Sequence, residues 1–150
     1  MKLTSSAAKQ RGTMMLELAL LLPFLILILM LVLEGSQLVR THVVLNNAAR
    51  EGARLSVMPE NQGSSKIADI RAAVVAYAAQ NNVTISNPDT NVVINQSVTV
   101  AMPAGYAAMT ASQVTVNCTY TLNYLAVFTW LGVPSTYTLQ GSAQFRNFNS

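Results

Sequence analysis

The sequence predicts an α+β protein: a long N-terminal transmembrane-plus-amphipathic helix, then a second helix packed on a small antiparallel sheet. Three observations carry this prediction. A nearly pure apolar run occupies residues 14–33, helical spacing of apolar residues continues to about residue 57, and apolar and polar residues alternate over much of the C-terminal half. Apolar residues recurring every three or four positions indicate a helix, and strict alternation indicates a strand with one buried face.

The apolar run explains an unusual composition. The 150 residues are 51% hydrophobic and only 10% charged, whereas about 25% is ordinary for a soluble domain. Residues 14–33 contain one charged residue, Glu17, and one proline, Pro23. A helix of about 20 residues spans about 30 Å, the thickness of a bilayer hydrocarbon core. We therefore expect a transmembrane helix over residues 13–33, in a helix that begins near Thr13 or Met14.

The charges around this run predict its orientation. Residues 1–12 form a leader with three basic residues and no acidic one, so it is expected to stay cytoplasmic. The remaining six basic residues are balanced by six acidic ones. No basic stripe with interleaved aromatic residues is present, so we expect no nucleic-acid partner.

Helical spacing continues beyond the membrane as an amphipathic extension, residues 34–58. The extension contains a patch of small residues that permits another helix to approach closely. It also carries charged residues that either pair, within or between helices, or form a solvated face. The predicted helix-packing residues are Ala48, Ala49, Arg50, Glu51, Gly52 and Arg54. The segment 58–65 then ends the helix with proline, glycine and serine.

Residues 66–150 are expected to form an extracytoplasmic α+β domain. A second helix over residues 66–80 would cover the apolar face of the sheet. The predicted strands are 83–85, 92–100, 113–124 and 136–145, with a turn at 87–90 and a loop at 101–112. The apolar connection 125–134 could fold into the core, lie on the membrane surface or dock on another subunit.

Enzymatic chemistry finds no support in the sequence. His42 is the only histidine and Cys118 the only cysteine, and no nucleophile, carboxylate pair or metal-ligand cluster can be assembled around them. We therefore expect a protein that is not an enzyme and has no metal or cofactor. Cys118 is expected to be buried in its strand, with an intermolecular disulfide as the alternative.

The leader ends in an arrangement that suggests processing. Gly12 closes it, and Glu17 follows five residues later inside the apolar run. This run is longer than the apolar region of a simple signal peptide. Cleavage of the Gly12–Thr13 bond would give Thr13 a free ammonium group, and Glu17 could pair with it in the same chain or a neighbour. Such pairing offsets the cost of a carboxylate near a membrane, and a negative charge suits the first helical turn.

These residues resemble a known family. Gly12 followed by Glu17 is similar to the type IV prepilin cleavage site. The run Glu17 to Pro23, the later Glu34-Gly35 and above all the segment 46–54, NNAAREGAR, resemble the TadE-like family of pseudopilins, or minor pilins, of the tight-adherence (Flp, type IVc) pilus system. The resemblance covers residues 11 to about 57 well and the strand-rich end only in outline. Family members usually carry Phe where this chain has Leu18.

The resemblance implies a pilin-like fold, a cut after Gly12 by prepilin peptidase and N-methylation at Thr13. It further implies a bacterial inner-membrane protein with a periplasmic C-terminal domain, which supports pilus biogenesis, adhesion or biofilm formation, either at the membrane or within an extracellular pilus. The implied partners are the membrane, prepilin peptidase, other pilins or pseudopilins in a homo- or hetero-oligomer, and the pilus assembly platform. The alternative is an uncut membrane-anchored scaffold or binding protein of a secretion complex.

Overall fold

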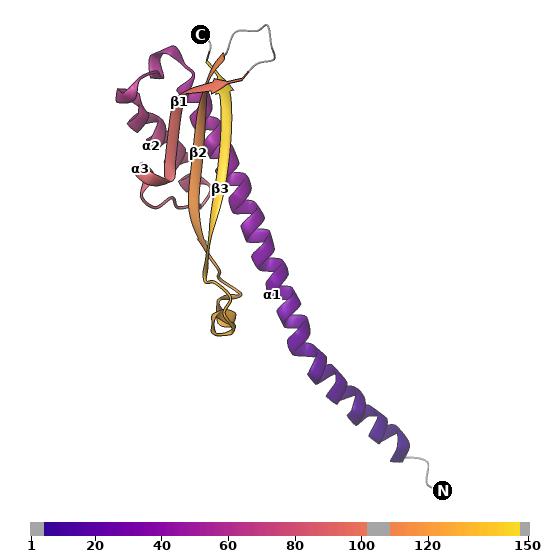
Figure 1. The fold of residues 1–150 in the computed structure, drawn as a ribbon. Helices are drawn as coiled ribbons and strands as arrows, with labels where there is room; N and C mark the ends of the chain where they lie inside the picture. The colour runs from indigo at the N-terminus through magenta and orange to yellow at the C-terminus, as the bar shows by residue number, and fades with distance from the viewer. Residues whose placement is uncertain (1–4, 102–108, 148–150) are drawn as a thin grey trace.

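The fold is a long helix whose second half carries a small sheet and a second helix (Figure 1). It is described by a computed structural model for residues 5–101 and 109–147, with side chains from Met14 onward except those of Val127 and Leu131. The elements are α1 (Ser5–Ser56), η1 (Pro59–Asn61), η2 (Ser64–Lys66), α2 (Ile67–Gln80), α3 (Pro88–Asn91), β1 (Val92–Val100), β2 (Met109–Thr121), η3 (Ala126–Leu131) and β3 (Thr136–Arg146). This architecture confirms the predicted α+β class.

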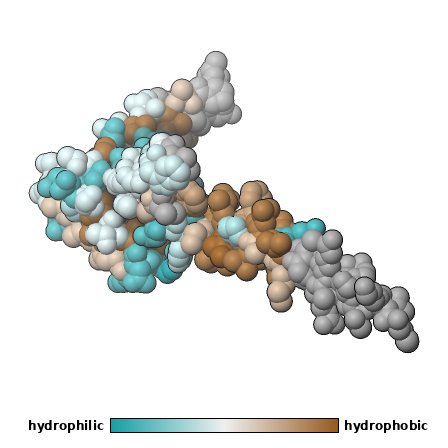
Figure 2. All heavy atoms as spheres, turned by 90° about the horizontal axis from the view of Figure 1, so that it is seen from below, coloured by the Kyte–Doolittle hydropathy of each residue, from teal (hydrophilic) through white to brown (hydrophobic). Residues whose placement is uncertain are grey.

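Helix α1 is one element of 52 residues that continues through Pro23. An 18-residue stretch of it has a mean hydropathy of 2.9 and is not buried within the chain, so α1 is long and apolar enough to cross a membrane. Figure 2 shows hydrophobic surface gathered on this projecting part. The predicted start near Thr13 or Met14 is wrong, because α1 already begins at Ser5. Alanine, lysine, glutamine and arginine in the leader are good helix formers.

The sheet has three antiparallel strands in the order β1-β2-β3. In its register Val92 lies opposite Val116, and Cys118 lies opposite Leu139. Strand β1 matches its prediction and β3 ends one residue later than expected. Strand β2 begins at Met109, so the end of the predicted loop 101–112 is a strand, and residues 102–108 of that loop lie outside the described residues. The strand ends at Thr121, three residues before the predicted end at 124.

Two local predictions are wrong. Residues 83–85 form no strand, although Val83 and Ile85 are buried in the core. Alternating burial in this extended segment gives the same pattern as a strand, but no neighbouring strand pairs with it. The predicted turn 87–90 contains the start of α3, with Asn87 in the left-handed region (φ 44°) and Pro88 at the first helical position, where a missing N–H costs little.

Both helices contribute to the core that covers the sheet. The second half of α1 supplies Leu45, Ala48, Ala49 and Ala53, and α2 supplies Val74 and Ala78; these pack with Val92 of β1 and with Val114, Val116 and Cys118 of β2. The cover of the sheet is therefore shared, and not provided by α2 alone. Cys118 is buried and its Sγ donates to the Thr84 carbonyl at 3.4 Å, which confirms its predicted burial. That burial raises the pKa of the Cys118 thiol.

Candidate functional site: the N-terminal helix and its junction with the sheet

The predicted processing site lies on the projecting part of α1. Gly12 and Thr13 have helical backbone, and their side chains lie outside the described ones. Glu17 is exposed and follows Thr13 by four residues, a spacing that places two residues on the same face of a helix. The helix thus brings position 13 and Glu17 to one face, while cleavage and pairing themselves stay predictions.

The projecting part presents apolar side chains to its surroundings. Large aliphatic and aromatic residues from Met14 to Leu33 are exposed, among them Leu20 at 78%. Contiguous apolar surface of this size marks a contact with lipid or with other protein. The described part of the chain therefore leaves most of this half of α1 uncovered.

The small residues of the amphipathic extension have a different surrounding. Ala48, Ala49 and Ala53 are buried in the chain's own core. A Cβ built on Gly52 would lie 2.5 Å from Val74 Cγ2 of α2 and 3.2 Å from Val114 Cγ1 of β2. The close approach that the small residues permit is therefore made by α2 and the sheet of the same chain.

The charged residues of the same segment lie on the other face. Arg50 is exposed, and Arg54 pairs with Glu51 within α1, with Nη2 to Oε1 at 2.6 Å and Nε to Oε2 at 3.0 Å. Such solvent-exposed pairs contribute little to stability. In this structure the pair belongs to one helix, and a contact of these residues with another subunit stays a prediction.

Strand β3 approaches the backbone of α1 closely. A Cβ built on Gly141 would lie 2.5 Å from the carbonyl carbon of Leu45 and 2.7 Å from the backbone nitrogen of Asn46. The neighbouring Ser142 N–H donates to Asn46 Oδ1 at 3.3 Å. The absent side chain at position 141 thus sets the distance between the helix and the sheet.

The structure reveals a junction that the sequence reasoning missed. Glu34, at the end of the apolar run, is buried, with only 3% of its surface exposed. Its Oε1 accepts the Tyr120 hydroxyl at 2.7 Å, and its Oε2 accepts the N–H of Tyr124 at 2.7 Å and of Leu125 at 3.2 Å. The Asn123 N–H donates to both oxygens, at 3.3 and 3.2 Å. Four donors from the end of β2 and the chain beyond it therefore hold one carboxylate of α1.

Burial and charge also act on the donor. Burial, and after it the hydrogen bond to Glu34, raise the pKa of Tyr120 to about 12. Tyr120 accordingly remains a neutral donor at physiological pH. The sequence did hold one signal for this junction, since a carboxylate at the end of an apolar run needs partners. Its donors lie 86 to 91 residues away in the chain, which spacing rules cannot connect.

No group of three or more histidine, cysteine, aspartate or glutamate residues that could hold a metal is found among the described residues. His42 is an exposed helix residue whose Nδ1 lies 3.3 Å from Asn46 Nδ2.

Comparison with known proteins relates the long helix to a protein family. The family model described as TadE-like protein matches residues 12–54. No curated protein and no solved structure matches the chain. The matched segment begins at Gly12 and runs through the exposed apolar half of α1 into the half that the sheet covers. Residues 12–54, which form most of α1, are therefore similar to TadE-like proteins.

Proposed function

We propose that this protein is a pilin-like structural or assembly component of a type IVc (tight-adherence) pilus. One observation carries the proposal. The first half of α1 is apolar and exposed, whereas its second half belongs to the core of a folded domain. A helix of this kind anchors a domain to a membrane and can later pack against equivalent helices. The TadE-like match over residues 12–54 supports the same role.

The proposed topology follows from charge. The basic leader, residues 1–12, lies in the cytoplasm, residues 13–33 cross the inner membrane, and the domain lies in the periplasm. Partners are prepilin peptidase, other pilins or pseudopilins and the assembly platform, so the protein acts in a homo- or hetero-oligomer. Its role lies in pilus biogenesis, adhesion or biofilm formation.

Processing provides the step from anchor to assembly. Prepilin peptidase hydrolyses the Gly12–Thr13 bond, which releases the basic leader and leaves Thr13 with a free amine, the position of N-methylation. Glu17, on the same helix face, pairs with this amine in its own chain or a neighbouring one. The loss of the cytoplasmic charges makes extraction of α1 from the membrane less costly.

The alternative is an uncut membrane-anchored scaffold or binding protein of a secretion complex. It shares the anchor and the folded domain with the pilin, so fold alone does not separate the two. The state of the Gly12–Thr13 bond does. A processed pilin begins at Thr13 in cells with an active prepilin peptidase, whereas a scaffold keeps Met1 or begins at Lys2.

The test is the intact mass and N-terminal sequence of the full chain extracted from membranes after co-expression with prepilin peptidase. We expect a chain beginning at Thr13, and Gly12→Leu should retain the leader because a bulky residue blocks access to the backbone. Gly35→Leu is the matched control, since the position of a Gly35 Cβ is open and the variant should be cut normally. An unprocessed wild-type chain beside an active peptidase would refute the pilin proposal.

A further inference from the structure

The connection between β2 and β3 forms an apolar tip. This tip, residues 122–135, contains η3 and no charged residue. Its tryptophan, Trp130, is 77% exposed. An uncharged apolar segment with an exposed indole indicates a surface that contacts an apolar partner.

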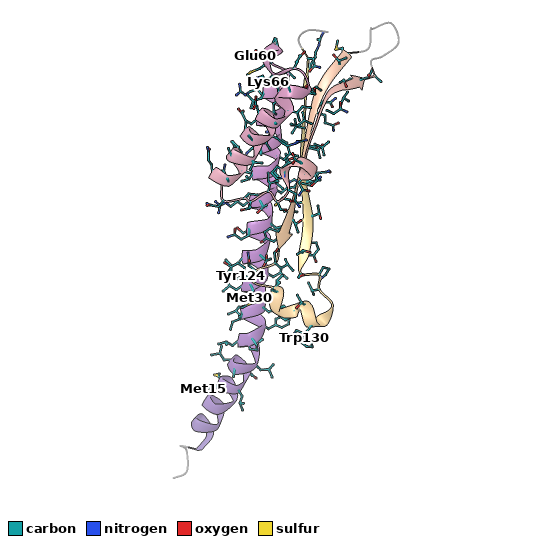
Figure 3. The ribbon with its side chains drawn as sticks, turned by 90° about the vertical axis from the view of Figure 1, so that its left-hand side faces the viewer. Met15, Met30, Glu60, Lys66, Tyr124 and Trp130 are labelled. Carbon is teal, nitrogen blue, oxygen red and sulfur yellow. The ribbon has the colours of Figure 1, made fainter. Side chains whose placement is uncertain are left out.

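The tip lies beside the membrane-spanning half of α1. Leu125, Phe128 and Val133 surround an apolar hollow of about 280 Å³ together with Leu27 and Leu31 of α1. Leu27 precedes Glu34 by seven residues, which is about 10 Å along a helix. Figure 3 shows Trp130 beside α1, at a level between Met30 and Met15. A bilayer that surrounds residues 14–33 therefore reaches the tip as well.

The Glu34 junction holds the tip in this position. The carboxylate binds the amides of Asn123, Tyr124 and Leu125, which are the residues where the chain leaves β2 and enters the tip. Movement of the tip away from α1 would leave a buried carboxylate without these partners, which is strongly unfavourable in an apolar environment. The tip is thus fixed to the helix at the membrane boundary.

Part of the tip backbone is hydrogen-bonded within the protein. Its N–H groups need partners within the protein wherever water is excluded. Besides the three amides bound to Glu34, Leu122 N–H donates to the Ser135 carbonyl, Phe128 to Leu125 and Gly132 to Thr129, and Pro134 has no N–H. Tryptophan itself concentrates where membrane and water meet.

We propose that the tip is a second membrane-embedded element of this protein. It enters the outer part of the leaflet on the side of the sheet domain, and its partner is the phospholipid itself. Trp130 lies among the upper acyl chains and the adjoining head groups, and α1 and the tip together hold the domain at two points. The inference requires α1 to cross a membrane, and it is independent of cleavage and of any role in a pilus.

Trp130 is the only tryptophan, so its fluorescence reports on the tip directly. The experiment uses the full, uncut chain in phosphatidylcholine nanodiscs, with bromine atoms placed at different depths on the acyl chains. We expect blue-shifted emission, protection from the water-soluble quencher acrylamide and loss of most emission with bromines near the head groups. Bromines near the chain ends should quench less.

A matched control moves the indole away from the membrane. In Trp130→Phe/Phe145→Trp the tryptophan lies near the far end of β3, about 30 Å from the start of that strand. Position 145 is partly exposed, so acrylamide should quench this variant and brominated lipid should not. Glu34→Gln should shift Trp130 toward acrylamide accessibility, because the neutral amide binds the tip amides less strongly.

Two results would overturn the inference. Quenching of wild-type Trp130 by acrylamide but not by brominated lipid would place the tip in water. Protection from both quenchers would show that protein, such as a second copy, covers the tip in place of lipid. Because the experiment needs no peptidase, failure of the pilin proposal leaves its outcome unchanged.

Discussion

At the scale of single residues, the connection between the membrane helix and the sheet domain depends on Glu34. Its carboxylate accepts hydrogen bonds from one hydroxyl and three backbone amides, and it is almost fully buried. A carboxylate is buried without large cost only when donors replace its water shell. The arrangement therefore connects α1 firmly to the end of β2, and Tyr120 contributes the side-chain donor.

Tyr120→Phe tests this connection. Removal of the hydroxyl takes one hydrogen bond from a buried charge, and such bonds contribute about 1.5–3 kcal/mol. We expect the free energy of unfolding to fall by about that amount in urea denaturation of the detergent-solubilised chain, followed by circular dichroism. Tyr137→Phe is the control, because Tyr137 lies opposite Tyr120 on β3 but is 41% exposed. It should change stability by less than about 0.5 kcal/mol.

The same variant has a signature at alkaline pH. The pKa of Tyr120 rises from its ordinary value of 10.0 to about 12 in the folded protein. Folding thus favours the neutral form of Tyr120. Its contribution to the free energy of unfolding is fully present below pH 10 and is lost as the pH rises toward about 12. Tyr120→Phe should therefore lose less stability than the wild type as the pH rises from 10 toward 12. In an alkaline titration followed by tyrosinate absorbance, the variant should lack one step at high pH. An unchanged alkaline profile would contradict the role assigned to the Tyr120 hydroxyl.

Glu17 is the second carboxylate of α1, and its proposed partner arises only on cleavage. For Glu17→Ala we expect normal removal of the leader but loss of incorporation beside other pilins, measured as the variant's amount in sheared surface fibres. Glu17→Gln should fail similarly, because pairing with the Thr13 amine needs the negative charge. Glu60→Ala, at an exposed position in η1, should assemble normally. Normal fibres with Glu17→Ala would remove Glu17 from this role.

At the scale of elements, α1 performs two tasks along one continuous helix. Its first half exposes aliphatic side chains, and its second half replaces them with alanine and glycine where α2 and the sheet pack. Gly52 and Gly141 mark the closest approaches, but they differ in kind. A Cβ on Gly52 meets the ends of two valine side chains, whereas one on Gly141 meets the α1 backbone.

Gly141→Ala is therefore expected to be the more damaging of the two alanine variants. Its Cβ would lie 2.5 Å from the Leu45 carbonyl carbon, and a helix backbone cannot yield as a side-chain end can. We expect a loss of about 1–3 kcal/mol, typical of overpacking, seen as a lower thermal midpoint. Gly35→Ala is the control: its Cβ meets nothing within 4 Å, so better helix propensity should give a gain of up to about 1 kcal/mol. Equal effects of Gly141→Ala and Gly35→Ala would contradict the close packing of β3 on α1.

At the scale of the whole molecule, the folded domain begins inside the helix and not after it. Leu45, Ala48, Ala49 and Ala53 of α1 belong to the same core as α2 and the sheet. The membrane anchor and the folded domain are consequently joined by continuous helix, with no flexible linker between them (Figure 1). Orientation of the anchor is thereby transmitted to the sheet.

Two fragments test this boundary. Residues 34–150 retain the helical half that covers the sheet and keep Glu34, so we expect a fragment with cooperative thermal unfolding and resistance to proteolysis. Residues 58–150 lose the core residues of α1 and expose the apolar sheet face, so this fragment should be degraded or aggregate. Folding of the shorter fragment to the same protease resistance would show that α1 is dispensable for the core.

The sequence by itself determined the features that depend on local periodicity. The apolar run predicted a helix able to cross a membrane, and alternation at Val114, Val116 and Cys118 predicted the buried face of β2. The prediction of a strand at 83–85 failed because alternating burial does not require a pairing partner. The segment 46–54 lies within the stretch that matches the TadE-like family model. The contacts of its small residues with α2 and the sheet of the same chain became visible only in the fold.

Tertiary structure alone decided which distant groups meet. Glu34 and Tyr120 are 86 positions apart, and their contact depends on the way β2 runs back along α1 toward the membrane. The sequence allowed three locations for the apolar segment 125–134, namely the core, the membrane surface or another subunit. The fold excludes the core, because the segment lies beside α1 and Trp130 is exposed. Periodicity fixes which face of an element is apolar, because that depends on neighbours along the chain. What the face packs against depends on long-range chain topology, which no local pattern encodes.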